Sequence, residues 1–203
     1  CASTALSYLA HTILCVHHLN SNANEFQKKR YLPKLISGEY IGALGMTEPG
    51  AGSDALGGMQ TRAVKKGNTF ILNGSKTFIT NGPLADVAVV YARTGEEKKN
   101  ISTFIVEKNF QGYSVGKKMD KMGMRASATS ELYFDQCQVP EENLVGKIGE
   151  GHLHMKANLD IERITIAAIS TGIARASLDE AVEYSKVRKQ FGKPLVNFKW
   201  FRK

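Results

Sequence analysis

The chain has 203 residues, of which 42% are hydrophobic and 23% charged, so it carries enough apolar side chains for a folded core and lacks a disordered composition. Its net charge of +8 comes from scattered runs such as Lys28-Lys29-Arg30. This pattern favours an anionic partner but not a nucleic acid, because nucleic-acid-binding modules gather basic residues in one stripe. No apolar run approaches the ~20 residues that span a bilayer, so no integral membrane segment is expected.

The cysteines and histidines indicate neither a disulfide framework nor a metal site. Cys1, Cys15 and Cys137 are an odd number without short paired spacing, which fits a reducing compartment. His17-His18 and His152-x-His154 lack further ligands at helical spacing, so we expect structural or solvated histidines. The first residue is not methionine, which indicates a processed or partial chain.

Residues 1–40 have the pattern of the end of a helical domain. From Ala2 to about Ile36, apolar residues such as Leu6, Leu9 and Ile13 recur at spacings of three and four, which predicts helix. Polar residues 20–24 should separate this helix from a second, shorter one.

Residues 41–149 have the pattern of a central β-domain. The dipeptide Asn73-Gly74 is a tight-turn signal, so a hairpin is predicted between Thr69–Leu72 and Lys76–Ile79. Further strands are predicted at 87–92, 102–106 and 131–137 with no helices between them. This order favours an antiparallel, barrel-like sheet over a doubly wound fold.

Residues 150–203 should begin a second helical domain. Apolar residues from about His152 to Lys189 predict one long helix, which Phe191-Gly192-Lys193-Pro194 should end. The chain is therefore expected to be an α+β, multi-domain protein.

The loop Met46–Asp54 is the most informative segment for function. Pro49 fixes its own φ, Gly50 and Gly52 permit close backbone approach, and Thr47 and Ser53 offer hydroxyl groups. Such a loop can approach a flat ligand that carries phosphate groups. An ordinary β-turn followed by a helix cap explains the same residues.

Six separated strings together resemble the acyl-CoA dehydrogenase family of flavoproteins. The resemblance runs from about Leu6 to Phe198 and covers only the middle of a family member, between a longer N-terminal helical domain and the rest of a C-terminal helical domain. The strings are Tyr31-Leu32-Pro33 with Ser37-Gly38-Glu39, Met46–Asp54, Leu72-Asn73-Gly74-x-Lys76, Ile79-Thr80-Asn81-Gly82, Lys121-Met122-Gly123-Met124-Arg125 and Arg188-Lys189-Gln190-Phe191-Gly192.

The resemblance implies that FAD is the cofactor. Thr47 would bond the polar edge of the isoalloxazine, and Phe78 stands where the family commonly has tryptophan, which keeps an aromatic face. Arg188 would reach the phosphates of the flavin nucleotide across a subunit boundary. The implied cofactor-binding residues are Leu44, Gly45, Met46, Thr47, Gly52, Ser53, Phe78, Ile79, Thr80, Arg188 and Phe191.

The resemblance also implies a reaction, the α,β-dehydrogenation of an acyl-CoA thioester. A carboxylate near apolar surface serves as its base, because desolvation raises a carboxyl pKa toward working pH. Glu162 is the candidate, and a base at the Glu of this Glu-Arg pair resembles the isovaleryl and long-chain branches of the family. The implied substrate-binding residues are Ser53, Asp160, Ile161, Glu162 and Arg163. A charged pair on a solvated helix face is the alternative for Glu162-Arg163.

The isovaleryl branch implies a short branched acyl-CoA substrate, a role in leucine breakdown and electron-transfer flavoprotein as the electron acceptor. A homotetramer is implied for the complete protein, in the mitochondrial matrix of a eukaryote or the cytoplasm of a bacterium. Alternatives are another acyl-CoA substrate, oxygen as acceptor, or a non-catalytic fragment that binds CoA esters or flavin. Lys199, where the family usually has glutamine, and Trp200–Lys203 depart from the family pattern.

Overall fold

The computed structural model describes residues 1–97 and 99–199, so the divergent segment Trp200–Lys203 lies outside the described residues. The chain forms two compact units. The first holds Cys1 and Ser3–Glu162, and the second holds Ala2 and Arg163–Lys203. Within the described residues, no helix is both long enough and apolar enough to cross a membrane.

Helices form the N-terminal part of the first unit, as the apolar spacing predicted. The second helix starts with a capping box, in which Asn24 and Gln27 each accept a hydrogen bond from the other's backbone N–H. It ends at Gly38, whose φ of 79° suits a residue without a Cβ. The helical elements are α1 (Ala2–Leu9), a π-helix η1 (Ala10–His17), α2 (His18–Asn22) and α3 (Glu25–Ser37).

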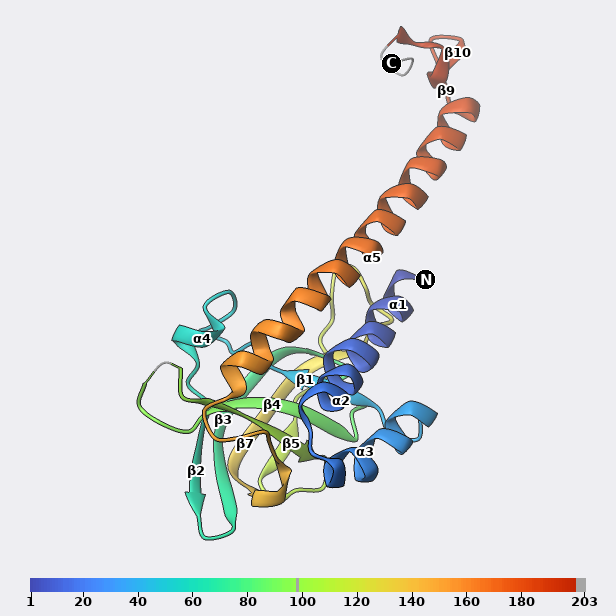
Figure 1. The fold of residues 1–203 in the computed structure, drawn as a ribbon. Coiled ribbons are helices and arrows are strands. Elements are labelled where there is room, and N and C mark those ends of the chain that lie inside the picture. The colour runs from blue at the N-terminus through green and yellow to red at the C-terminus, as the bar shows by residue number, and fades with distance from the viewer. Residues whose placement is uncertain (98, 200–203) are drawn as a thin grey trace. The chain divides into compact units, whose positions relative to one another are not determined.

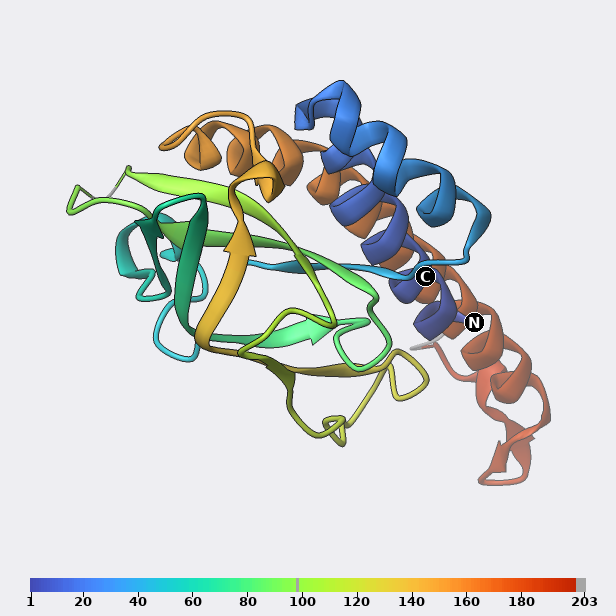
Figure 2. The same cartoon turned by 90° about the horizontal axis from the view of Figure 1, so that it is seen from below.

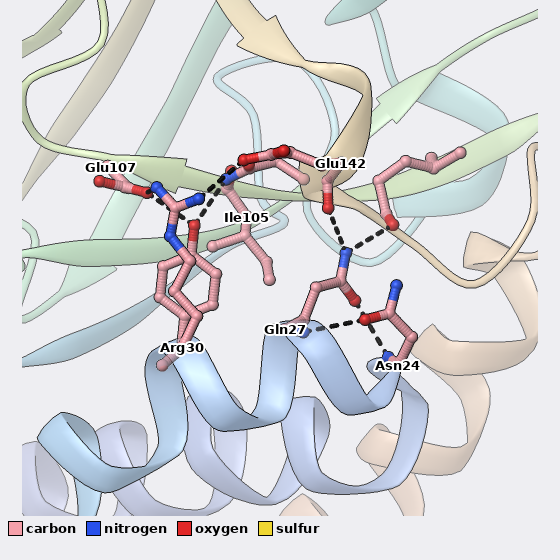
Figure 3. A network of polar contacts seen from close by, with 9 residues as sticks. Asn24, Gln27, Arg30, Ile105, Glu107 and Glu142 are labelled. Carbon is pink, nitrogen blue, oxygen red and sulfur yellow. Dashed lines mark hydrogen bonds and ion pairs between the residues drawn. The ribbon is translucent and has the colours of Figure 1, made fainter.

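Polar side chains fasten α3 to the rest of the first unit (Figure 3). The Gln27 amide is 1% exposed and donates to the backbone oxygens of Glu142 at 2.7 Å and Leu144 at 2.8 Å. The Arg30 guanidinium contacts the carboxylates of Glu107 at 2.8 Å and Glu142 at 2.7 Å. Gln27 thus has two roles. Its side-chain oxygen completes the capping box that starts α3, and its side-chain N–H groups satisfy two backbone acceptors that fix the position of the helix.

Eight strands form the central sheet, in the order β6-β7-β3-β2-β4-β5-β8, with β1 paired to β4. Most neighbours are antiparallel, and β1 and β2 each pair with β4 in parallel. The prediction of a largely antiparallel α+β fold is therefore confirmed (Figure 1). The strands are β1 (Gly42–Gly45), β2 (Arg62–Lys66), β3 (Thr69–Thr80), β4 (Val87–Arg93), β5 (Ile101–Glu107), β6 (Tyr113–Val115), β7 (Thr129–Pro140) and β8 (Leu144–Val145).

The strand β4 is buried on both faces, which explains its unbroken apolar sequence. Val87 and Val89 pack against the N-terminal helices, and Ala88 and Val90 pack in the core on the other face of the strand. Figures 1 and 2 show the N-terminal helices lying along the sheet. Tyr91 joins a third cluster, which lies beside the start of the C-terminal helix.

The predicted hairpin at Asn73-Gly74 is wrong. Residues 69–80 form one strand, and the turn lies between β2 and β3, where Gly67 has φ of 59°. At Gly74 the backbone instead passes close to Thr61. A Cβ added at this position would lie 2.7 Å from the Cα of Thr61, so only glycine fits. The side-chain Oδ1 of Asn73 accepts hydrogen bonds from the backbone N–H and the side-chain amide of Gln136, where β7 carries a bulge.

The long C-terminal helix is confirmed as α5 (Gly151–Val187), which begins in the first unit and ends in the second. The segment that was predicted to end it forms a small hairpin of β9 (Lys189–Gln190) and β10 (Lys193–Pro194). Its turn residues Phe191 and Gly192 both have positive φ, at 50° and 78°. The remaining helices of the described residues are α4 (Ala55–Gly58), η2 (Glu141–Asn143) and η3 (Leu195–Asn197).

Candidate active site

A pocket of about 140 Å³ in the first unit brings together four separated parts of the sequence. The end of β1 and the start of the Met46–Asp54 loop form one wall, the end of β3 forms another, and η1 and α5 complete it. Its lining residues are Ala10, Leu14, Leu44, Met46, Thr47, Phe78, Ile79, Thr80 and Glu162.

The Met46–Asp54 loop is held to β3 by a buried ion pair. The Lys76 ammonium lies 2.8 Å from the Glu48 carboxylate and donates to the Met46 carbonyl oxygen at 3.2 Å. The Lys76 side chain is 0% exposed, and the backbone N–H groups of Gln60 and Thr61 also donate to Glu48. The loop therefore reaches the pocket with its backbone fixed.

Charge and burial oppose each other in this pair. Burial lowers the pKa of Lys76 to about 8, against the opposing effect of Glu48. Burial would raise the pKa of Glu48, but the Lys76 charge and the hydrogen bonds to the carboxylate lower it overall. The pair is thus ionised at neutral pH.

The rest of the loop has the ordinary turn structure that was the alternative interpretation. Glu48 and Ala51 exchange two backbone hydrogen bonds around Pro49-Gly50. The Asp54 carboxylate accepts from the Gly57 N–H at 3.1 Å and caps α4. The structure thus shows the turn and the helix cap, while Met46 and Thr47, which precede the turn, line the pocket, and their approach to a ligand stays a prediction.

A bulge in β3 turns Phe78 outward at the pocket. Between Lys76 and Ile79 the strand advances three residues, while β7 advances two, from Leu132 to Ser130. Phe78 has φ of 58° and is 67% exposed, although it stands between the buried residues Thr77 and Ile79. The bulge thus interrupts the alternation of the strand and places an aromatic ring at the pocket.

Glu162 reaches the pocket from α5 and is half-buried. It follows Met155 by seven residues and Leu159 by three, so the three side chains share one face of the helix. Met155 is 2% exposed and Leu159 packs on the same cluster, so this face is the apolar one. The carboxylate therefore borders apolar surface, the setting that proton abstraction requires.

The structure brings seven of the predicted site residues together in this pocket. Gly45 is buried beside it in β1, where a Cβ would lie 3.3 Å from Lys76 Cγ. Gly52 and Ser53 are exposed in the loop. The seven lining residues are Leu44, Met46, Thr47, Phe78, Ile79, Thr80 and Glu162.

The other predicted residues do not line this pocket. On α5, Ile161 is half-buried, and Asp160 and Arg163 are exposed. Arg188 and Phe191 belong to the second unit, where Phe191 is 92% exposed and lies edge-on to Phe198. Their roles toward a cofactor or substrate stay predictions.

Two parts of the site were not predicted from the sequence. Ala10 and Leu14 line the pocket from η1, and the apolar spacing gave no sign that this segment is a π-helix. Lys76 belongs to Leu72-Asn73-Gly74-x-Lys76, one of the strings that resemble the family, but the sequence assigned it no role. Nothing in the sequence signalled its burial, because Lys76 stands between the polar residues Ser75 and Thr77.

Three domains of one family match most of the chain. Residues 1–39 match the N-terminal domain of acyl-CoA dehydrogenases, residues 43–137 the middle domain and residues 149–203 the C-terminal domain. Isovaleryl-CoA dehydrogenase, mitochondrial, from Pongo abelii is 49% identical over 200 residues, which are 97% of this chain and 47% of that protein.

Solved structures give the same result. Butyryl-CoA dehydrogenase from Megasphaera elsdenii is 45% identical with a TM-score of 0.93, covering 99% of this chain and 53% of that one. An acyl-CoA dehydrogenase complexed with FAD from Bacillus anthracis is 38% identical with a TM-score of 0.92, covering 98% of this chain and 35% of that one. The chain spans about half the length of the curated relatives it matches. It belongs to the acyl-CoA dehydrogenase family.

Proposed function

We propose that the protein to which this chain belongs is an FAD-dependent acyl-CoA dehydrogenase that uses Glu162 as its catalytic base. The observation that carries the proposal is the pocket itself. It joins a half-buried carboxylate to residues of two segments that the resemblance assigns to the flavin, around Thr47 and around Phe78. These parts lie more than eighty residues from Glu162 in the sequence and meet only in the fold.

The residues of the pocket fit a flavin in their chemistry. Leu44 and Ile79 give apolar surface, the exposed ring of Phe78 gives an aromatic face, and the hydroxyls of Thr47 and Thr80 offer hydrogen bonds to polar ring atoms. Cavities that enclose whole ligands measure ~300–1,000 Å³. At about 140 Å³, these residues enclose only part of a flavin. Arg188 does not line this pocket. We propose that it pairs with the phosphates of the flavin nucleotide that is bound to a neighbouring subunit of a homotetramer.

Glu162 would remove the α-proton of the acyl thioester. FAD, when bound, accepts the hydride that leaves the β-carbon. The apolar face around Met155 and Leu159 would keep water from competing with the Glu162 carboxylate for this proton. Asp160, Ile161 and Arg163 on the same helix, with Ser53 from the loop, would border the acyl-CoA.

For the substrate we propose isovaleryl-CoA, with electron-transfer flavoprotein as the electron acceptor. The position of the base on α5 supports this choice, and so does the 49% identity to an isovaleryl-CoA dehydrogenase. A straight short chain is the second candidate, because butyryl-CoA dehydrogenase is 45% identical over nearly the whole chain. The ratio of kcat/KM for isovaleryl-CoA and butyryl-CoA separates the two candidates.

The substitution Glu162→Gln tests the proposed base. In a version of the protein with the length of its curated relatives, loaded with FAD, we expect turnover of both acyl-CoA substrates to fall by ~10²–10⁴-fold, because glutamine cannot accept the proton. Flavin absorbance should not change. Glu183→Gln is the matched control, since Glu183 is exposed on the same helix and pairs only with Lys186 among the contacts described. Turnover of Glu162→Gln within a few-fold of the parent would place the base elsewhere.

A further inference from the structure

A cluster of buried polar side chains lies behind the candidate pocket and belongs to no predicted site. His18 Nε2 and the Tyr91 hydroxyl are 2.9 Å apart, and both side chains are 0% exposed. The His154 ring stands edge-on to His18 with 5.8 Å between ring centroids, and its Nδ1 lies 3.1 Å from the Thr103 hydroxyl. Buried groups of this kind are costly unless they are hydrogen-bonded, so their arrangement calls for a role.

The hydrogen bonding of His18 fixes the direction of the bond to Tyr91. His18 Nδ1 is buried and has no hydrogen-bond partner among the described residues. A proton on Nδ1 would be an unsatisfied buried donor, whereas a proton on Nε2 donates to the Tyr91 oxygen. The Nε2–H tautomer is therefore favoured, and it leaves the Tyr91 O–H free to donate to another acceptor.

One acceptor on the same cluster is a carboxylate of α5. Tyr91 packs in one cluster with Met155, and Leu159 packs against that cluster. Glu162 continues the same helix face one turn further along. Burial raises the pKa of Tyr91, and the charge of Glu162 raises it further, so the carboxylate is close enough for its charge to act on the phenol.

We propose that Tyr91 is a positioning residue for Glu162, and that His18 sets the direction of its hydroxyl. The hydroxyl donates toward the Glu162 carboxylate, directly or through one water, and holds it in the rotamer that faces the pocket. This inference rests on the proposed function, because it assumes that Glu162 is the base.

Burial favours the neutral form of both histidines, because it lowers the pKa of each. Burial lowers the pKa of His18 to about 3, and the nearby His154 and His17 lower it further. Burial also lowers the pKa of His154, partly against the charge of Glu150. His18 therefore acts as a fixed neutral donor, and the acidic limb of a rate profile does not report its titration.

The test uses four variants of the complete, FAD-loaded protein, with kcat measured from pH 5 to 9. For Tyr91→Phe we expect kcat to fall by roughly tenfold and the acidic limb to move up by about one pH unit, because the ionised carboxylate loses a donor. His18→Leu should give a smaller change in the same direction. His18→Gln should behave like the parent, because its amide N–H replaces the imidazole N–H. Thr103→Val, at the residue paired with Tyr91 across β4 and β5, removes the buried hydrogen bond to His154 but keeps the Tyr91 hydroxyl and its bond to His18, so its profile should match the parent.

Each outcome decides between specific claims. If Glu162→Gln stays active, the proposed function fails whatever the other variants do. If Glu162→Gln is inactive and Tyr91→Phe keeps the parent kcat and limb, the positioning role is overturned. If the acidic limb of Thr103→Val shifts as far as that of Tyr91→Phe, the effect comes from packing and the positioning role is also overturned. If Tyr91→Phe does not fold, identical profiles for His18→Leu and His18→Gln overturn it.

Discussion

Replacing Lys76 with methionine tests how the Met46–Asp54 loop is fixed. The ammonium lies 2.8 Å from Glu48, with side chains that are 0% and 5% exposed. Methionine keeps most of the length and fills the space but leaves a buried carboxylate without its counter-charge. Removing one partner of a buried ion pair costs ~3–5 kcal/mol of unfolding free energy.

We expect the lower end of that range, about 3 kcal/mol. The Glu48 carboxylate would keep two backbone donors, the N–H of Gln60 at 2.6 Å and of Thr61 at 2.9 Å, which continue to stabilise its charge. Adding Glu48→Gln to Lys76→Met removes the stranded charge, so the double variant should be more stable than Lys76→Met alone, by about 1–2 kcal/mol.

Urea titration at pH 7 measures these differences. Lys65→Met is the matched control, because Lys65 carries the same side chain in the neighbouring strand β2 and pairs with Glu141 at a site where both are nearly half exposed. An exposed pair contributes about 0–1 kcal/mol. If Lys76→Met is as stable as Lys65→Met, the buried pair does not hold the loop and the reasoning is wrong.

Two further predictions concern stability. The folded chain resists protonation of His18, whose pKa is lowered from 6.5 to about 3, so the unfolded chain binds the proton first and stability should fall as the pH drops below 6.5. The unfolding free energy should fall by about 2 kcal/mol between pH 7.5 and pH 5. Urea titrations at the two pH values should show this loss in the parent and not in His18→Gln. Equal losses in both proteins would contradict the assignment. Gln27→Leu leaves the backbone oxygens of Glu142 and Leu144 without their donor and should lower the unfolding free energy by about 3 kcal/mol. Lys29→Leu, on the exposed part of the same helix, should change it little.

Most helices and strands could be predicted because their signals are local. Apolar residues at helical spacing mark α5, and the apolar run Val87–Ala92 marks a strand buried on both faces. The hairpin predicted at Asn73-Gly74 was wrong, because the glycine there serves a contact with a distant part of the chain and not a turn. The backbone at Gly74 passes against Thr61, and only a residue without a Cβ fits there.

The candidate site divides in the same way. The segments around Thr47 and Phe78 and the residue Glu162 were identified by pattern, and the fold places them in one pocket. The partners of buried polar groups could not be identified, because neither member of a pair reveals the other. His18 and Tyr91 are 73 residues apart in sequence, and Lys76 and Glu48 are 28 apart.

The backbone at Phe78 has a consequence for protein engineering. Glycine or asparagine adopts a φ of 58° at lower cost than phenylalanine, so folding free energy alone disfavours the native residue at this position. A thermostability screen that selects only for folding would be drawn to replace Phe78 and would erode the pocket wall while reporting an improved protein. Directed evolution of this scaffold should therefore select for cofactor retention together with heat resistance.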